Sequence, residues 1–192
     1  LGNCKYYTKT QQDFTQGLPY CQQCIEDEPE NPEARYFGAW CLAEMGRYDE
    51  AWPSFKWLID RKNDKDKKIQ KHAKWAQERV QAYFAKHFND GVKFLNENNL
   101  MSAKDEFKAA SQINPTKPEA FLNLGYVENQ MGRSDQALRA FKRAIEIAPD
   151  NATAYEYYSV ALGRKRDALL AEARPDSAAI AEVSAELKTT LD

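Results

Sequence analysis

Apolar side chains along much of this chain recur every three or four residues, the spacing that places them on one face of a helix. The stretch 66–83 contains no proline or glycine and shows the pattern at four positions: Ile69, Ala73, Ala76 and Val80. It predicts a long helix, with Asn63 and Asp64 as the turn and cap before it. A second apolar face, near the C-terminus, combines Ile180, Val183, Ala185, Leu187 and Leu191. The pattern is that of an all-α chain.

Two short sequences in the chain are nearly the same. MGRYDEA at 45–51 recurs as MGRSDQA at 131–137, in each case a turn followed by the start of a helix. The segment 118–151 carries further spaced residues: Phe121, Leu124, Gly125, Ala137, Phe141, Ala144 and Pro149. The segment just before it, 84–117, has the same spacing in Gly91, Phe94, Ala103, Phe107, Ala110 and Pro115. Each period predicts one pair of antiparallel helices.

This spacing resembles the tetratricopeptide repeat, a helical hairpin with a period of about 34 residues. The resemblance implies an all-α fold, in which antiparallel helix pairs form a right-handed superhelix (an α–α solenoid) closed by a C-terminal capping helix. Two helices of a pair cross closely only where side chains are small, while large rings fill the space beside the crossing. The small residues expected at two successive crossings are Gly91, Ala103 and Ala110, then Gly125, Ala137 and Ala144.

An earlier pair of repeats has a frame of its own, in which Pro19 and Pro53 lie one such period apart. We expect both prolines in the first turn of the second helix of their repeat, where a missing N–H matters little. The first of these repeats is weaker, because Lys5 stands where a small residue is expected. Its first helix is therefore predicted to be incomplete or shifted.

The two frames do not join, because the matching turns at 45–51 and 131–137 are separated by two periods and about half of another. We interpret 66–83 as an N-terminal extension of the third repeat's first helix. Nothing in the composition marks a second core, so we predict a single domain. Its parts, within 1–192, are repeats at about 1–31 (the weak one), 32–65, 84–117 and 118–151, the helical insertion 66–83, and a partial repeat with a capping helix at 152–192. Residues 173–176 are expected to form the break before the capping helix.

In the family that the sequence resembles, the first helices of successive repeats line a concave groove that holds a peptide. Carried over residue by residue, the groove positions are Tyr36, Phe37, Trp40, Phe88, Asn89, Val92, Leu95, Leu122, Asn123, Tyr126, Asn129, Tyr157 and Val160. Asn89 and Asn123 occupy equivalent places, where the family often uses asparagine to bind a peptide backbone. The places of a basic carboxylate clamp hold Tyr36, Glu119 and Tyr157 instead. The resemblance thus implies an apolar or amphipathic guest rather than an acidic tail.

We expect a groove of mostly apolar and aromatic side chains to be covered by a partner or by another part of the chain, because a contiguous apolar patch of this size is unusual on the surface of a monomer. The leading hypothesis is a scaffold, adaptor or chaperone-like protein that holds an apolar peptide or amphipathic helix. Alternatively, these residues contact only each other and the closing helix at 176–192. A further alternative is a self-assembling repeat protein that forms a homo-oligomer, including a bacterial envelope lipoprotein. Leu1-Gly2-Asn3-Cys4 resembles a lipoprotein cleavage box, except that Asn3 is not small.

Charge and composition narrow the class of partner. Lysine and arginine number 27 against 29 acidic residues, a net charge of −2, which lacks the basic footprint of a nucleic-acid binder. The apolar runs are far shorter than a membrane span, so we expect no membrane insertion of this segment. The expected partner is therefore another protein or peptide.

The sequence offers no catalytic or metal-binding motif. His72 and His87 are too far apart along the chain to show a ligand spacing, and no nucleophile motif or phosphate-binding loop is present. We expect no enzymatic activity, no cofactor and no metal site.

All four cysteines, Cys4, Cys21, Cys24 and Cys41, lie near the N-terminus, and no cysteine follows Cys41. The repeat frame brings them close together on three neighbouring helices. Three interpretations remain open: buried free thiols, one or two disulfides that staple a weak terminal repeat, or a four-thiolate metal site. Disulfides would favour export to an oxidising compartment such as the periplasm, and free thiols the cytoplasm.

Overall fold

The chain folds into helices joined by short turns. The computed structural model describes residues 1–172 and 176–191, and none of these lies in a strand. The helical elements are α1 (Gly2–Lys5), the π-helical η1 (Tyr6–Gln11), α2 (Phe14–Asp27), α3 (Pro32–Glu44), α4 (Tyr48–Asp60), α5 (Lys67–Asn96), α6 (Leu100–Ile113), α7 (Pro118–Gln130), α8 (Ser134–Ile147), α9 (Ala152–Leu170) and α10 (Ser177–Leu191). The predicted all-α architecture of antiparallel helix pairs is confirmed.

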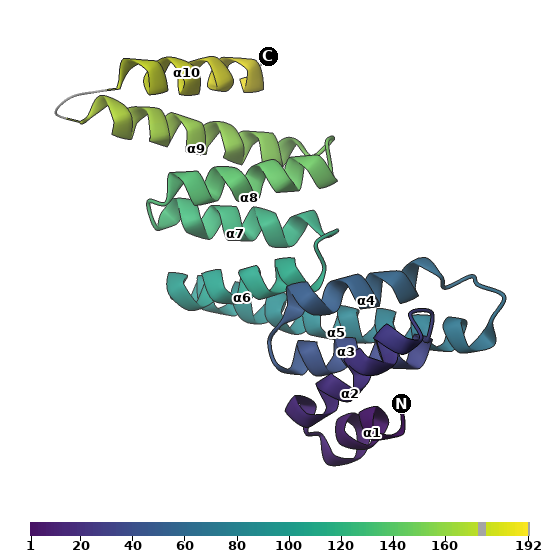
Figure 1. Cartoon of the computed structure of the whole chain (residues 1–192). Coiled ribbons are helices and arrows are strands. Elements are labelled where there is room, and N and C mark those ends of the chain that lie inside the picture. The colour runs from purple at the N-terminus through teal and green to yellow at the C-terminus, as the bar shows by residue number, and fades with distance from the viewer. Residues whose placement is uncertain (173–175, 192) are drawn as a thin grey trace. The chain divides into compact units, whose positions relative to one another are not determined.

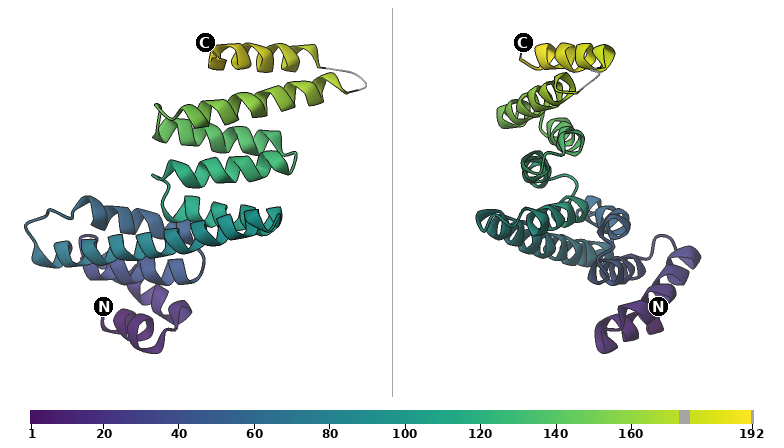
Figure 2. Two further views of the ribbon diagram at one scale, coloured as in Figure 1. Left: turned by 180° about the vertical axis from the view of Figure 1, so that it is seen from behind. Right: turned by 90° about the vertical axis from the view of Figure 1, so that its left-hand side faces the viewer.

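The helices belong to two compact units. Unit 1 contains residues 1–86 and 112–114, and unit 2 contains residues 87–111 and 115–192. In unit 1, α2 and α4 pack against α3, and in unit 2, α7 to α10 pack each against the next (Figure 1). Figure 2 shows the same helix pairs from two further directions.

The repeated MGR sequences form the same turn in both units. Gly46 and Gly132 each adopt a φ of 73°, a backbone conformation that favours glycine. After α3, the N–H of Arg47 donates to the carbonyl of Leu42 at 2.9 Å, and after α7 the N–H of Arg133 donates to Glu128 at 2.9 Å. These bonds satisfy carbonyls at the helix end and reverse the chain, so the next helix runs back along the first.

Asparagine and aspartate side chains fix several helix starts. Asn31 Oδ1 accepts the N–H groups of Glu33 at 3.1 Å and Ala34 at 3.0 Å, while Pro32 occupies the first position of α3, where its missing N–H is no loss. At α5 the cap is Asp66, which accepts the N–H of Lys68 at 2.7 Å. The prediction of Asp64 as the cap was wrong by two residues, because Asp64 instead accepts the N–H of Asp66 within the preceding turn.

The two prolines of the N-terminal frame occupy equivalent places, but not in the first turn. Pro19 is the sixth residue of α2, and Pro53 is the sixth residue of α4. The expectation of a first-turn position was therefore wrong. Each proline leaves the carbonyl four residues earlier without its helical donor. Those carbonyls belong to Thr15 and Asp49, which lie at the surface, so water can replace the missing N–H.

The first helix of the N-terminal repeat is short and distorted. α1 widens into the π-turns of η1, which ends at Gln12 with a φ of 54°. Lys5, which is too large for the small-residue position, extends outward and its Nζ lies 2.5 Å from Glu33 Oε2 on α3. The N-terminal segment is thereby attached to α3 through a charge on its outer side.

The segment 66–83, interpreted as an insertion, has no boundary at its C-terminal end, because α5 continues through it to Asn96. In unit 1, Ala73, Ala76 and Val80 of this helix are buried. The helical spacing that predicted the extension therefore corresponds to a face that packs into the core.

Glycine lets the helices of unit 2 approach closely. A Cβ built at Gly125 would lie 2.6 Å from the Phe141 ring, and one at Gly91 would lie 2.8 Å from the Phe107 ring. The alanines expected at the same crossings, Ala103, Ala110, Ala137 and Ala144, are fully buried. The predicted crossings are confirmed, each with a phenylalanine ring against the backbone of the facing helix.

The closing helix α10 runs back along α9 (Figure 1). Val183 is buried, and Leu187 packs against the same cluster as Leu162 and Tyr158 of α9. Ala185 is exposed, so it does not belong to the docked face. Of the remaining predictions, residues 173–175 of the expected break and the side chain of Leu191 lie outside the described residues.

The glycine contacts lead to a test of stability. Gly125→Ala should lower the free energy of unfolding by about 1–3 kcal/mol, because the added methyl overpacks the Phe141 ring. Gly163→Ala, in α9, is the control: a Cβ there meets nothing within 4 Å, so alanine should stabilise the helix by up to about 1 kcal/mol. Urea unfolding measures both. Equal effects would contradict the close crossing.

Candidate functional site

Unit 2 contains a pocket of about 700 Å³ that combines amide and apolar side chains. We call it the amide pocket, and its lining residues are Leu95, Asn96, Asn98, Leu100, Leu122, Asn123, Tyr126, Gln130, Thr153 and Tyr157. They come from the end of α5, the α5–α6 turn, the start of α6, α7 and the first turns of α9. Half of them carry an amide or an aliphatic hydroxyl, and the other half are leucine or tyrosine.

Hydrogen bonds orient the polar wall of the amide pocket. Asn123 Nδ2 donates to the carbonyl of Glu119 at 2.8 Å, one turn earlier on α7. Gln130 Nε2 donates to the Tyr126 hydroxyl at 3.0 Å. With its amide N–H held by the helix, Asn123 can present Oδ1 to a donor in the pocket.

The aromatic wall of the amide pocket is supported from behind. The Tyr126 and Tyr157 rings lie 5.9 Å apart, and the Phe141 ring lies 5.8 Å from Tyr157. Phe141 is fully buried at the glycine crossing. The tyrosines therefore rest on the core of the unit, which limits their movement.

A second pocket, of about 500 Å³, lies in unit 1 and is largely aromatic. We call it the aromatic pocket, and its lining residues are Lys9, Tyr36, Phe37, Trp40, Trp75, Glu78, Arg79, Ala82 and Tyr83. Three of them come from α3 and five from α5. The long α5 therefore supplies more than half of the lining.

Arg79 holds the aromatic residues of this pocket in place. Its guanidinium carbon lies 3.8 Å from the centre of the Trp40 ring, and its Nε donates to the Tyr36 hydroxyl at 3.0 Å. Glu44 accepts from Trp40 Nε1 at 2.9 Å and from the Tyr83 hydroxyl. Burial, together with the hydrogen bond to Glu44, raises the pKa of Tyr83, so its hydroxyl stays a donor.

The structure separates the predicted groove residues. Tyr36, Phe37 and Trp40 line the aromatic pocket, whereas Leu95, Leu122, Asn123, Tyr126 and Tyr157 line the amide pocket. Tyr36 and Phe37 are each only 5% exposed, so their surfaces contribute little area to a partner. The predicted groove residues therefore include members of two pockets, one in each unit.

Other predicted groove residues are taken up by the core. Phe88 and Val92 pack in the cluster around Phe107, and the Phe88 and Phe107 rings meet edge to face at 5.7 Å. Asn129 is buried, and its backbone carbonyl accepts from Arg164 Nη1 at 3.1 Å. Phe88 and Val92 are partly buried and Asn129 is buried, and none of the three belongs to the lining of either pocket, so their place in a groove stays a prediction.

Two further groove candidates lie at the surface, outside the lining of either pocket. Asn89 of α5 and Val160 of α9 are both exposed, and neither belongs to a lining. Asn89 and Asn123 occupy equivalent places in the repeat, but only Asn123 belongs to the lining of the amide pocket.

Sequence reasoning missed several lining residues. Asn96, Asn98, Gln130 and Thr153 belong to the amide pocket, and Arg79 organises the aromatic one. The run of asparagines just before α6 was the available signal, since Asn98 takes a φ of 56° at the helix end. Arg79 gave no such signal, because it lies in the stretch interpreted as an insertion.

The closing helix does not fill the amide pocket. The pocket lining contains residues of α5, α6, α7 and α9, and α10 instead packs on α9 through Val183. The Tyr158 hydroxyl donates to Glu186 of α10, which helps to fix that packing. The alternative in which the closing helix occupies the pocket is wrong for the described residues.

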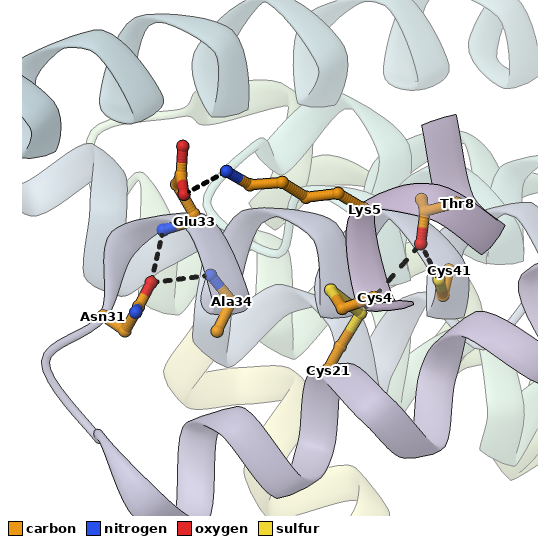
Figure 3. Close-up of a disulfide and its surroundings, with 8 residues drawn as sticks. All are labelled: Cys4, Lys5, Thr8, Cys21, Asn31, Glu33, Ala34 and Cys41. Atoms are coloured by element: carbon orange, nitrogen blue, oxygen red, sulfur yellow. Dashed lines mark hydrogen bonds and ion pairs between the residues drawn. A yellow bond between two sulfur atoms is a disulfide. The ribbon is translucent and has the colours of Figure 1, made fainter. Parts of the chain in front are cut away.

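The four cysteines separate into a disulfide and two free thiols. Cys4 of α1 and Cys21 of α2 form a disulfide with a Cα–Cα distance of 4.9 Å (Figure 3). Cys24 is half-buried and free, and Cys41 of α3 is fully buried and free. Cys4 is fully buried, and its sulfur is bonded to Cys21.

Thr8 and an ion pair complete the contacts around the disulfide. The Thr8 hydroxyl lies 3.0 Å from Cys41 Sγ and 3.9 Å from Cys21 Sγ. Burial raises the pKa of the Cys41 thiol, which keeps it protonated and unreactive. Burial alone would raise the pKa of Glu33, but the hydrogen bond and charge of Lys5 outweigh it and lower that pKa.

The two histidines act in packing and pairing. His72 is buried, its Nδ1 lies 2.7 Å from the carbonyl of Lys68, and its ring meets Trp75 edge to face at 5.1 Å. His87 Nδ1 lies 2.6 Å from Glu106 Oε2.

In the described part of the chain, no three His, Cys, Asp or Glu side chains gather as metal ligands would. Likewise, no described helix has the length and apolar character needed to cross a membrane.

Two segments of the chain match models of known protein families. Residues 118–151, which contain α7 and α8, match a family model described as tetratricopeptide repeat. Residues 10–51 match a second model with the same description.

Several known proteins are similar over part or all of the chain. A structure of MamA from Desulfovibrio magneticus RS-1 is 18% identical, with 99% of this chain and 97% of that chain covered and a TM-score of 0.42. The TPR2AB domain of yeast Sti1, in a complex with pHSP90, is 12% identical, with 99% and 91% covered and a TM-score of 0.41. Human protein O-mannosyl-transferase TMTC1 is 28% identical over 64 residues, which are 33% of this chain and 7% of that protein.

The disulfide can be tested by thiol labelling. In denaturant without reductant, two thiols should react, those of Cys24 and Cys41, and four should react after reduction. In the folded protein Cys24 should react first, because Cys41 is fully buried. Mass spectrometry counts the labels. Four labels without reductant would contradict the disulfide.

Removing the disulfide should also lower stability. The bond closes a loop with a sequence separation of 17, so Cys4→Ser with Cys21→Ser should lower the free energy of unfolding by about 3 kcal/mol. Cys24→Ser is the matched control and should change little, because that thiol is half-buried and unbonded. Chemical denaturation compares the variants.

Proposed function

Because the chain belongs to the tetratricopeptide-repeat family, whose stacked helix pairs present extended binding surfaces, we propose that it is a protein-interaction scaffold that holds a peptide in the amide pocket. The observation that supports this proposal is the convergence of amide side chains from α5, α7 and the α5–α6 turn around a floor of leucine and tyrosine. No step of catalysis is needed for this function.

The chemistry of the amide pocket matches a peptide backbone. An extended peptide presents alternating N–H donors and C=O acceptors, and the amides of asparagine and glutamine offer both kinds of partner. Asn96, Asn98, Asn123 and Gln130 provide four such groups. Backbone recognition of this kind holds the guest without reading its sequence.

The apolar half of the pocket selects the side chains of the guest. Leu95, Leu122, Tyr126 and Tyr157 can bury one or two apolar side chains of the peptide. The guest that we propose is an extended segment with apolar residues at alternate positions, so that one face enters the pocket. This differs from the sequence-based expectation of a mostly apolar groove, because half of the lining is polar.

The amide pocket can be tested with peptides selected from a random phage-displayed library on the immobilised chain. Asn123→Ala should weaken the selected peptides about tenfold, the loss of one hydrogen bond of roughly 1.4 kcal/mol. Tyr126→Ala should weaken them at least as much, because it removes the aromatic wall. Isothermal titration calorimetry measures both dissociation constants.

Asn89→Ala is the matched control for this experiment, since Asn89 lies one repeat period before Asn123 and outside the pocket. It should leave affinity unchanged. If all three variants bind alike, the amide pocket is not the binding site. Light scattering of the free chain separates self-association from peptide binding, since a concentration-dependent mass would point to a homo-oligomer instead.

A further inference from the structure

Unit 2 carries a third pocket, of about 430 Å³, between α6, α7 and α8. Its apolar floor contains Phe121 and Leu124 of α7 and Ala140 of α8. The two large floor residues are half-buried, so a ligand can still cover part of their surface. We call it the basic pocket, for the charges described next.

Four cations surround the floor of the basic pocket. Lys104 and Lys108 lie one turn apart on α6, and Arg139 and Arg143 lie one turn apart on α8. Lysine and arginine stems of this length can lie along an apolar surface and keep their charges at the rim. Two basic pairs therefore stand on two sides of one apolar depression.

The acidic groups around the basic pocket do not cancel this charge. Glu128 lies in the lining, but its side chain is only 11% exposed and its Oε2 lies 3.4 Å from Arg133 Nη1. The two other ion pairs are local: Lys104 with Asp105 at 2.9 Å, and Arg143 with Glu146 at 2.9 Å. The Arg143 pair lies at the surface, where such a pair contributes about 0–1 kcal/mol, so Arg143 can turn to a ligand. The Lys104 side chain is only 19% exposed, so Lys108 and Arg139, which are exposed, are the more accessible of the remaining cations.

The basic pocket and the amide pocket use opposite sides of α7. Leu122, Asn123, Tyr126 and Gln130 face the amide pocket, whereas Phe121, Leu124 and Glu128 face the basic one. At about 100° per residue, the centres of these two sets point about 180° apart around the helix. A ligand in one pocket therefore leaves the other open.

We propose that the basic pocket binds a second partner, an acidic peptide segment that carries a large apolar side chain. The apolar side chain enters the depression over Phe121 and Leu124, and the flanking carboxylates pair with the cations of α6 and α8. The charge pattern selects this partner, because an uncharged apolar segment would gain nothing from the rim cations, and a cationic segment would be repelled by them.

The probe for this proposal is a fluorescein-labelled peptide with one phenylalanine flanked on both sides by glutamates. Fluorescence anisotropy should show saturable binding to the full chain that weakens as salt is raised, since the contacts at the rim are exposed. Lys108→Gln combined with Arg139→Gln should raise the dissociation constant about tenfold or more. Peptides with alanine in place of phenylalanine, or glutamine in place of glutamate, should also bind more weakly.

Lys142→Gln is the control for charge, because Lys142 is exposed on α8 but outside the lining, and the variant removes one positive charge, as each half of the paired variant does. It should leave binding unchanged, as should Asn123→Ala in the amide pocket. The proposal is overturned if the glutamate peptide does not bind, if Lys142→Gln weakens it as much as the paired variant, or if Asn123→Ala abolishes it. Binding of phosphatidylserine vesicles without binding of the peptide would overturn it too.

Discussion

The packing of unit 2 depends on the close approach of a phenylalanine ring to a helix backbone at a glycine. Phe107 meets Gly91 in this way, and Phe141 meets Gly125 one period later. A ring that lies directly on a backbone brings two helices close together, because the glycine opposite it adds no side chain of its own, and small residues fill the rest of the crossing. The regular spacing of the sequence pattern is therefore a packing requirement, repeated once per helix pair.

This packing determines which surfaces are left for partners. α7 packs on α8 and α9, so its residues at the crossing are buried, while the two faces between these contacts stay accessible. One accessible face combines amides with tyrosines, and the other combines phenylalanine and leucine with a cationic rim. A single helix can thus present two chemically different surfaces, because its helical period distributes neighbouring residues over both. The proposed functions of the two pockets follow from this division.

Unit 1 is stabilised by a different set of interactions. A covalent bond joins Cys4 to Cys21, an ion pair joins Lys5 to Glu33, and Arg79 orders the aromatic residues around Trp40. The N-terminal segment is short and contains a distorted helix, so it can bury little apolar surface by itself. The disulfide and the polar contacts supply the attachment that an ideal helix pair would obtain from packing.

The local features of this protein could be predicted from its residues alone. The repeated MGR turns, the glycine crossings and the long apolar face around Ala76 each depend on residues at short, fixed spacings. The sites, in contrast, depended on the tertiary structure. Asn129 fits the groove pattern but is buried, whereas Arg79 fits no pattern but organises a pocket by binding Tyr36, which precedes it by 43 positions. The pairing of Cys4 with Cys21, among four nearby thiols, likewise depended on how the distorted first helix lies against α2. Contacts between residues far apart in sequence produce no regular spacing along the chain from which they could be predicted, because they depend on where whole helices pack.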